Sequence, residues 1–249
     1  FNKETGPIDR LSFDGVNFEL DDLNLDLIGK NQSISPQLLL EKDLSLSLSN
    51  YHLLSEDSLN KVEIGKISFL ENDLIVENIS FGPSVGRYNY LNQQGFQSDA
   101  IDGLIKKVTL ENIDFKEYLE NKKIRAQEIF LDNLELDVFR DKRLPLKEGV
   151  YKPMPQDLLR NASFDLEVDS VKIRNGIIRY QEFAPKSMLP GSIYFGDLNM
   201  VMAPFVMTKE EEEFPYEFTW VKANTKLMGE GEVNLNAKMF YKEPYPMEV

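Results

Sequence analysis

Three stretches of the chain repeat one phrase: LIVENISF at 74–81, VTLENIDF at 108–115 and IFLDNLEL at 129–136. Each stretch has two apolar residues at period two, then an acidic residue followed by Asn, then two more apolar residues at period two. Alternation of apolar and polar residues is typical of a β-strand with one buried and one wet face. We therefore interpret the phrase as a structural feature of the fold, because a catalytic site needs no such repeat.

The odd residue in the middle of the phrase decides how each strand continues. An unbroken strand would turn the second pair of apolar residues to the opposite face of the sheet. In the second copy, a β-bulge at Glu111-Asn112 keeps all four apolar residues on one side of a long, bent strand. A two-residue hairpin turn would instead place Leu110 opposite Ile113. Because Asn tolerates the left-handed backbone conformation and Glu does not favour it, we favour the bulge.

The rest of the sequence also favours strands over helices. In VKIRNGIIRY, at 171–180, Asn175-Gly176 predicts a hairpin that pairs Ile173 with Ile178. Alternating apolar residues predict further strands at 16–20, 23–27, 38–48, 62–64, 164–168 and 233–235. Helical periodicity is scarce, and short helices are expected from Ser35, from Phe115 to Lys122 and from Pro155.

Composition limits the classes of function. The chain has 249 residues, of which 42% are hydrophobic and 28% charged, so it is long enough to bury a core. Its net charge of −14 repels nucleic acid and anionic membrane surfaces as a whole, and we expect no nucleic-acid partner. The absence of cysteine excludes disulfides, thiolate catalysis and Cys-based zinc sites. No run approaches the roughly 18 apolar residues of a transmembrane helix.

Motifs that could carry chemistry are weak. GPSVG at 82–86 matches a nucleophile elbow with Ser84 as nucleophile, but an elbow requires a following helix and a later His. The polar RYNYLNQQG follows instead, and the single histidine, His52, comes earlier, so we expect a turn at Ser84 and a surface position for His52. The acidic runs at 21–26 and 210–213 lack the spaced ligands of a calcium loop and predict solvated surface. We therefore expect no catalytic residue, metal site, cofactor or enzymatic activity.

Two longer segments, 108–139 and 164–202, carry a resemblance to a known family. They contain a strand ending in Asn or Asn-Gly, an apolar-x-Tyr strand, a polar excursion, and then a pattern of the kind IYFGDLNM at 193–200. In these features the chain resembles the AsmA-like family of bacterial envelope proteins. More distantly, the succession of a strand, NIDFK at 112–116, a short helical link and another strand is similar to the opening of eukaryotic bridge-like lipid transfer proteins.

The resemblance implies a fold and a function. The fold is an elongated, curved antiparallel sheet that forms an open half-pipe, with an apolar inner face, a polar outer face and a few short helical links. The function is to hold or conduct lipid acyl chains between two membranes without chemistry, in the periplasm of a bacterial envelope, with inner- or outer-membrane proteins as further partners. Because AsmA-like proteins run longer and carry an N-terminal membrane anchor, we expect 1–249 to be one segment of a longer chain, lacking the anchor, with minor breaks near 82–103 and 144–155.

The residues expected to contact lipid are the apolar ones of the repeated phrase and of its neighbours. They are Leu46, Val76, Ile79, Val108, Leu110, Ile113, Phe115, Leu131, Leu134, Leu136, Val138, Ile173 and Ile178.

A closed β-sandwich would give the same alternation, because it buries its apolar faces against each other. The chain would then be a non-enzymatic envelope scaffold or a glycan-binding module. Sugar platforms need exposed aromatic rings, and the candidates Trp220, Tyr88, Tyr90 and Tyr216 are not clustered in the sequence. A hydrolase built on Ser84 is the third alternative.

Overall fold

A computed structural model describes residues 8–12, 15–20, 44–55, 57–70, 72–121, 123–147, 149, 165–208, 215–241 and 247–249; for residues 8–49 it describes the backbone alone. The described residues are mostly β, with 69% in strands and 8% in helices. Thirteen strands form one large sheet that is open and mostly antiparallel. The predicted all-β fold is confirmed, and the alternative of a closed β-sandwich is wrong, because the sheet does not close.

The strands, in chain order, are β1 (Ile8–Ser12), β2 (Gly15–Leu20), β3 (Leu44–Ser55), β4 (Asn60–Leu70), β5 (Asp73–Pro83), β6 (Asp99–Glu111), β7 (Lys123–Asp141), β8 (Asp165–Phe183), β9 (Gly191–Ala203), β10 (Phe205–Met207), β11 (Phe218–Leu227), β12 (Gly231–Phe240) and β13 (Met247–Glu248). The helices are α2 (Arg87–Gln94) and α3 (Phe115–Asn121).

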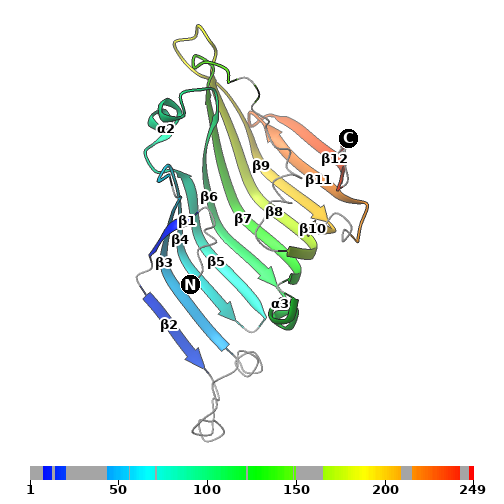
Figure 1. Cartoon of the computed structure of the whole chain (residues 1–249). Helices are drawn as coiled ribbons and strands as arrows, with labels where there is room; N and C mark the ends of the chain where they lie inside the picture. The colour runs from blue at the N-terminus through cyan, green and yellow to red at the C-terminus, as the bar shows by residue number, and fades with distance from the viewer. Residues whose placement is uncertain are drawn as a thin grey trace, which may run out of the picture.

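Neighbouring strands are mostly consecutive in the chain. From β3 to β7 each strand pairs antiparallel with the next, which makes a long meander (Figure 1). The central pair is different: β7 and β8 run parallel over 19 residues each, from Lys123 beside Asp165 to Asp141 beside Phe183. All the other strand pairs run antiparallel, so the predicted antiparallel sheet is confirmed with this pair as its exception. Parallel neighbours need a connection of at least about a dozen residues, and the chain between Asp141 and Asp165 is long enough.

A crease crosses the sheet from strand to strand. Five strands each place one residue in the left-handed region there, with φ between 51° and 55°: Asn50, Asn78, Asn133, Asn175 and Asp197. By register, Asn78 and Asn133 lie on either side of the same residue of β6, and Asn175 lies beside Asn133 across the parallel pair. We call this line of residues the crease.

The crease absorbs the odd residue of the repeated phrase. Asn78 and Asn133 are the Asn residues of its first and third copies, and β5 and β7 run straight through them with the same register on both sides. One left-handed residue turns the side-chain alternation by one position. The apolar residues before and after it therefore share a face, as the sequence predicted, without the register shift of a bulge.

The second copy of the phrase behaves differently, and the bulge predicted at Glu111-Asn112 is wrong. There β6 ends at Glu111, and the left-handed Asn112 begins the link to α3. The link still brings Ile113 and Phe115 into one apolar cluster with Val108 and Leu110. The shared face predicted for these four residues is therefore confirmed, although the device that produces it is a chain turn.

The hairpin predicted at Asn175-Gly176 is also wrong. Both residues lie inside β8, and Ile173 pairs with Met200 of β9 instead of Ile178. Strands β7 and β9 supply partners to β8 on both sides of Asn175, so the left-handed residue creases the strand and does not reverse it.

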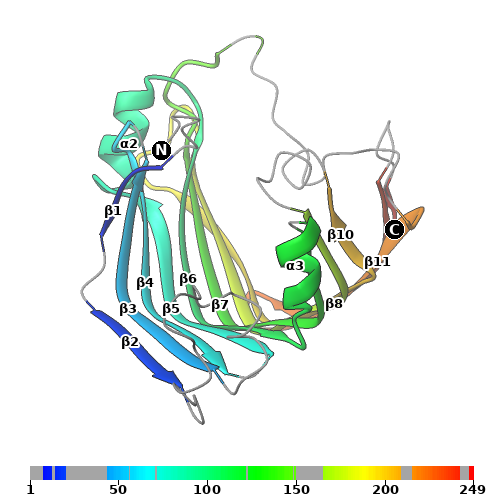
Figure 2. The same ribbon diagram turned by 60° about the horizontal axis from the view of Figure 1, so that its bottom comes forward.

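Two short helices cover opposite faces of the sheet. α3 confirms the helix predicted from Phe115 to Lys122, and it lies on the inner side of the curved sheet (Figure 2). α2 was not predicted, because its polar sequence resembles a turn. Its Leu91 is buried against Phe139, which lies on the other face from the neighbouring Val138. The helix ends at Gly95, which adopts the left-handed conformation and donates its N–H to the carbonyl of Leu91.

Several predictions lie outside the described residues. They are the helices from Ser35 and Pro155, the alternating segments 23–27 and 38–43, and the acidic runs at 21–26 and 210–213.

Candidate functional site

The apolar residues of neighbouring strands line up in rows across the sheet. On one side of the crease, one row contains Ile67, Val76, Val108, Leu131, Ile173, Met200, Ala223 and Leu235. The next row contains Phe69, Leu74, Leu110, Ile129, Val171, Met202, Val221 and Ala237. On the other side, one row contains Val62, Phe81, Gly103, Leu136, Ile178, Phe195 and Leu227. Every position is apolar or Gly, and we call the face that carries these rows the inner face.

The residues predicted to contact lipid all belong to this face or to its link. Ile113 and Phe115 lie in the link to α3. Most of the others occupy the rows. Ile79 and Leu134 both pair with Ile105, and Val138 pairs with Ile101 and Tyr180 on the same face. Leu46 pairs with Phe69 by backbone register. The structure therefore places the predicted residues together on one face of the sheet.

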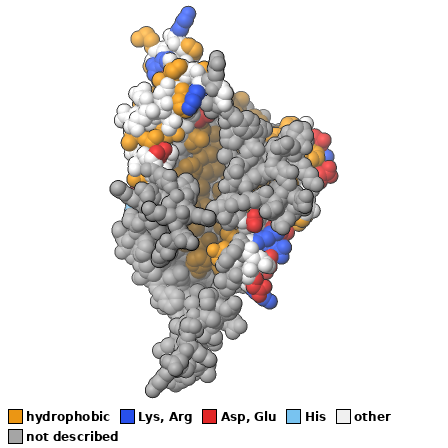
Figure 3. Space-filling model, in the orientation of Figure 1, with side chains coloured by type: hydrophobic (Ala, Val, Ile, Leu, Met, Phe, Trp, Pro, Cys, Tyr) orange, Lys and Arg blue, Asp and Glu red, His pale blue; other side chains and the backbone are white. Residues whose placement is uncertain are grey.

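The inner face is hollow where it can be seen. Figure 3 shows hydrophobic side chains lining a recessed area of this face. Leu134, in the middle of the sheet, is only 6% exposed, whereas Leu136 and Val138 beside it are half-buried. Leu134, next to the crease, is thus packed, whereas Leu136 and Val138 further along β7 keep free apolar surface.

One end of the inner face is closed by apolar packing. Ile113, before α3, and Phe205, in β10, are buried in a cluster with Ile129 and Val171 of the second row. Phe115 of α3 packs against the same cluster, and its ring lies 6.0 Å from that of Phe69 between centroids. This end of the hollow therefore has a hydrophobic wall.

The other end of the inner face is charged. Beyond Tyr180 the next cross-strand row consists of Asp99, Arg140 and Glu182, and Arg140 forms a two-bond ion pair with Asp99. Glu182 accepts a hydrogen bond of 2.6 Å from the Tyr180 hydroxyl and lies 2.7 Å from Lys142 Nζ. These contacts lower the pKa of Glu182, the bond to Lys142 most of all, and burial raises the pKa of Tyr180 to about 12. The face thus changes from apolar to ionic within one row.

The geometry around Ser84 gives no support for a nucleophile. Contrary to expectation a helix, α2, does follow the motif, but the Ser84 hydroxyl donates to the backbone carbonyl of Ser58. His52 is exposed on β3, with Nδ1 3.7 Å from Glu63 Oε1. In the part of the chain that the structure describes, no three His, Cys, Asp or Glu side chains are grouped as metal ligands. GEG at 229–231 forms the turn between β11 and β12.

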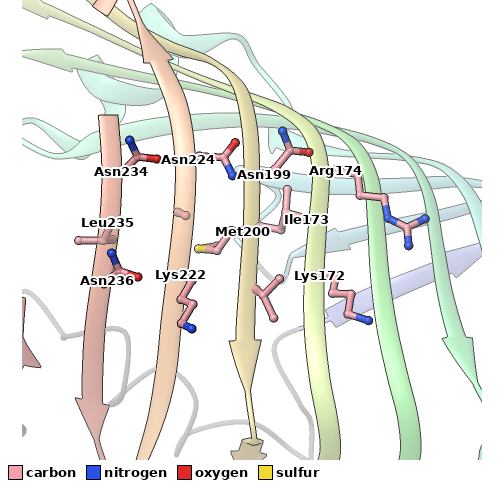
Figure 4. Close-up of a pocket in the computed structure, with 12 residues that line it drawn as sticks. Lys172, Ile173, Arg174, Asn199, Met200, Lys222, Asn224, Asn234, Leu235 and Asn236 are labelled. Carbon is pink, nitrogen blue, oxygen red and sulfur yellow. The ribbon is translucent and has the colours of Figure 1, made fainter. Parts of the chain in front are cut away.

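A second hollow, which sequence reasoning missed, lies on the outer face near the C-terminal edge. Its volume is about 340 Å³, and it crosses strands β8, β9, β11 and β12. Figure 4 shows Asn199, Asn224 and Asn234 side by side on neighbouring strands, with Lys222 and Lys172 further along. Only the registers of four strands that are distant in sequence bring these residues together, so no local pattern could have revealed them.

The aromatic candidates for a sugar platform separate in space. Trp220 is 45% exposed on the outer face of β11, beside the second hollow. Tyr88 belongs to α2, where its ring packs edge-on against Phe139 with centroids 5.1 Å apart. Trp220 is therefore the candidate with a neighbouring polar hollow.

Comparison with known proteins does not assign the chain to a family. No protein-family model matches the chain, and no curated protein sequence matches it. Among the described helices, none has the length and apolar character needed to cross a membrane.

Proposed function

We propose that the protein holds or conducts lipid acyl chains on the inner face of its sheet, as a non-enzymatic, AsmA-like component of a bacterial cell envelope. The observation that carries the proposal is the set of apolar rows, which stay on one face through the crease. In β7 the inner face extends over eleven residue steps, from Ile129 in the second row to Arg140 at the charged end, which at about 3.3 Å per residue is roughly 36 Å, longer than the roughly 15 Å hydrocarbon depth of one membrane leaflet. The inner face thus offers enough length for an extended acyl chain.

The energetic argument favours a hydrocarbon ligand. In an open sheet the apolar inner face is not covered by a second sheet. Since large exposed apolar patches are rare on soluble proteins, this face calls for an apolar ligand. Each buried CH₂ gains about 0.8 kcal/mol, so a chain that buries eight methylenes gains about 6 kcal/mol before the costs of association. Burial of this kind is non-directional, which suits movement along the face better than a fixed pocket.

The two unlike ends of the inner face support an amphipathic ligand. The apolar wall around Phe115 and Phe205 suits the end of a hydrocarbon tail. The ionic row of Asp99, Arg140 and Glu182 offers charges of both signs to a polar headgroup. In this arrangement the acyl chain lies across the crease and the headgroup lies at the ionic end.

Photo-crosslinking tests this proposal directly. Crosslinking groups at Leu110 and Leu136, on the inner face, should capture lipid from the expressing cell, and mass spectrometry of the adduct would identify it. Groups at Glu135 and Asp137, which alternate with Leu136 in β7 and face outward, are the matched controls. Equal capture at inner and outer positions, or none at either, would refute the lipid-holding face.

A charge placed on the inner face provides a second test. Leu136→Asp should leave the fold intact, because Leu136 is half-buried, and reduce captured lipid on the order of tenfold or more, because the carboxylate loses hydration beside a hydrocarbon. Leu104→Asp is the control, since Leu104 is 43% exposed and pairs with Glu135 on the outer face. Unchanged lipid content in Leu136→Asp would count against the proposal.

A further inference from the structure

The hollow on the outer face is the middle part of a longer groove. A smaller hollow lined by Val201, Ala203, Trp220 and Lys222 shares Val201 and Lys222 with it, and another shares Asn199, Asn224 and Asn234. Alternate residues of β11, from Trp220 to Lys226, follow the groove. The six residue steps from Trp220 to Lys226 span roughly 20 Å, so the groove suits a linear ligand of that length.

The middle of the groove is positively charged in a protein that is strongly negative. Lys172, Arg174 and Lys222 line it, and among the described lining residues there is no Asp or Glu. Lys172 is bound to Glu128 beside the groove, and the Arg174 guanidinium lies 4.1 Å from the centre of the Phe130 ring. With a net charge of −14 for the whole chain, this local arrangement favours an anionic group on the ligand.

The amide side chains indicate a ligand rich in hydroxyl groups. Asn224 pairs with Asn199 on one side and with Asn234 on the other, so three adjacent strands present Asn in one row. Asn is disfavoured in strands, so the row is not explained by strand stability. Asn199 is used at the crease, where its Oδ1 accepts from the N–H of Asn175. Carboxamides both donate and accept, which matches hydroxyl groups.

An exposed aromatic ring completes one end of the groove. The Trp220 ring is held edge-on by Phe218, with centroids 5.3 Å apart, and by Lys238, whose Nζ lies 5.1 Å from the ring centre. A ring fixed in this way loses little conformational freedom on binding and offers a flat apolar surface with a negative face. The C–H groups on one side of a sugar ring fit such a surface.

The geometry points to a binding site for an anionic sugar chain along the outer face of β11. In this site Trp220 stacks against one sugar ring, Lys222 with Lys172 and Arg174 binds a carboxylate or phosphate substituent, and Asn224 and Asn234 bind hydroxyl groups. The far end of the groove contains the ion pair of Lys226 and Asp197, 2.9 Å apart, together with Glu232. The anionic group therefore sits in the middle of the groove.

The structure favours a sugar chain over nucleic acid and over a membrane surface. Single-stranded nucleic acid is bound by several aromatic platforms in a basic channel, whereas the groove has one Trp and the chain is acidic overall. A membrane surface would face a continuous apolar patch, whereas four Asn side chains with Lys172, Arg174 and Lys222 line the middle of this groove. The site lies on the face opposite the proposed lipid rows and is independent of them.

The experiment uses the single tryptophan as the reporter, because Trp220 is the one Trp of the chain. A tetrasaccharide of alternating glucuronic acid and N-acetylglucosamine should change its fluorescence in a saturable way, and a neutral tetrasaccharide of N-acetylglucosamine should bind more weakly. Lys222→Gln should weaken the acidic tetrasaccharide by about tenfold, since a charge-assisted hydrogen bond is lost, and leave the neutral one unchanged. Lys107→Gln, outside the groove on the same face, should change neither.

Calorimetry with Trp220→Ala separates stacking from a fluorescence artefact, and this variant should weaken both sugars. The proposal is overturned if neither sugar binds, if Lys222→Gln and Lys107→Gln behave alike, or if inorganic phosphate alone competes as well as the acidic sugar. Preferential binding of single-stranded DNA or of anionic phospholipid vesicles would overturn it as well. Circular dichroism of each variant confirms that the fold is retained, since the substituted side chains are on the surface.

Discussion

Asn133 provides a test of the crease at the single residue where β7 crosses it. Its φ of 53° is tolerated by Asn and by Gly, while Ala or a larger residue without a polar side chain meets its own backbone there. Asn133→Ala should therefore destabilise the fold by about 1–2 kcal/mol, and Asn133→Gly should lie within about 1 kcal/mol of the native chain.

The Asn133→Ala variant could avoid the backbone strain if β7 changed its conformation. The free-energy cost of that change decides which conformation the variant adopts. If β7 kept a regular conformation through position 133, Leu134, Leu136 and Val138 would turn to the outer face. Exposing Leu134 costs about 1.5–3 kcal/mol, and exposing the half-buried Leu136 and Val138 costs about half as much each, which makes roughly 3–6 kcal/mol in total. Since the strain in Asn133→Ala is smaller, the variant should keep the native register and accept a strained backbone.

Thermal unfolding followed by circular dichroism measures the effect. For a chain of this size a change of 1 kcal/mol shifts the melting temperature by about 2–4 °C, which is readily resolved. Asn234→Ala, on the exposed side of β12 and without a positive φ, is the control and should change stability by less than about 0.5 kcal/mol. If Asn133→Ala is as stable as the native chain, or Asn133→Gly is as damaged as Asn133→Ala, the account of the crease is wrong.

Three further predictions follow from the described contacts. Gly103→Ala should cost about 1–3 kcal/mol, because its Cβ would lie 2.0 Å from Phe81 Cζ, and Phe81→Leu should recover most of the loss in a double-mutant cycle. Ser84→Ala should abolish no esterase activity, because the Ser84 hydroxyl donates to a backbone carbonyl; loss of a measured activity would contradict this. Hydrogen bonds from Arg143 hold the pKa of Asp141 below its ordinary value, so the stability it contributes is complete at neutral pH and is lost as pH falls below about 4, which urea unfolding at pH 7 and pH 3 would measure.

Local patterns were sufficient to predict many of the strands and the apolar faces of those strands. Alternation in LSLSLS at 44–49, for example, identified β3, and the apolar residues of the repeated phrase lie together because side-chain alternation is a property of the strand itself. The spacing of three between Leu131 and Leu134 also marked the crease, although a bulge or a hairpin would have had the same signature. One-dimensional spacing therefore determines which face a residue occupies but not how the backbone brings it there.

Pairing between distant strands could not be predicted from the sequence. Asn175-Gly176 has the local signature of a hairpin, yet Ile173 finds partners in β7 and β9, and those contacts extend β8 through the turn signal. The parallel pairing of β7 and β8 likewise depends on which strands come together in the folded sheet, and no local pattern specifies it. The outer groove depends on both, because it combines side chains of β8, β9, β11 and β12 that only the completed sheet aligns.

The crease explains why the phrase is repeated when its copies are unevenly spaced along the chain. From β3 to β7 the apolar positions on the two sides of this line are three residues apart, so each of these strands turns its alternation by one position at the same level as its neighbours. Without that turn its apolar residues would face outward on one side of the line. Asn133 and Asn175 satisfy this condition side by side in a parallel pair, and Asn78 satisfies it two strands away. The lengths of the connections are free to vary, because register is set between strands and not along the chain. A solenoid repeats a unit of fixed length; this sheet instead repeats a condition at one level of neighbouring strands, and the inner and outer faces keep separate chemistry because the condition is met.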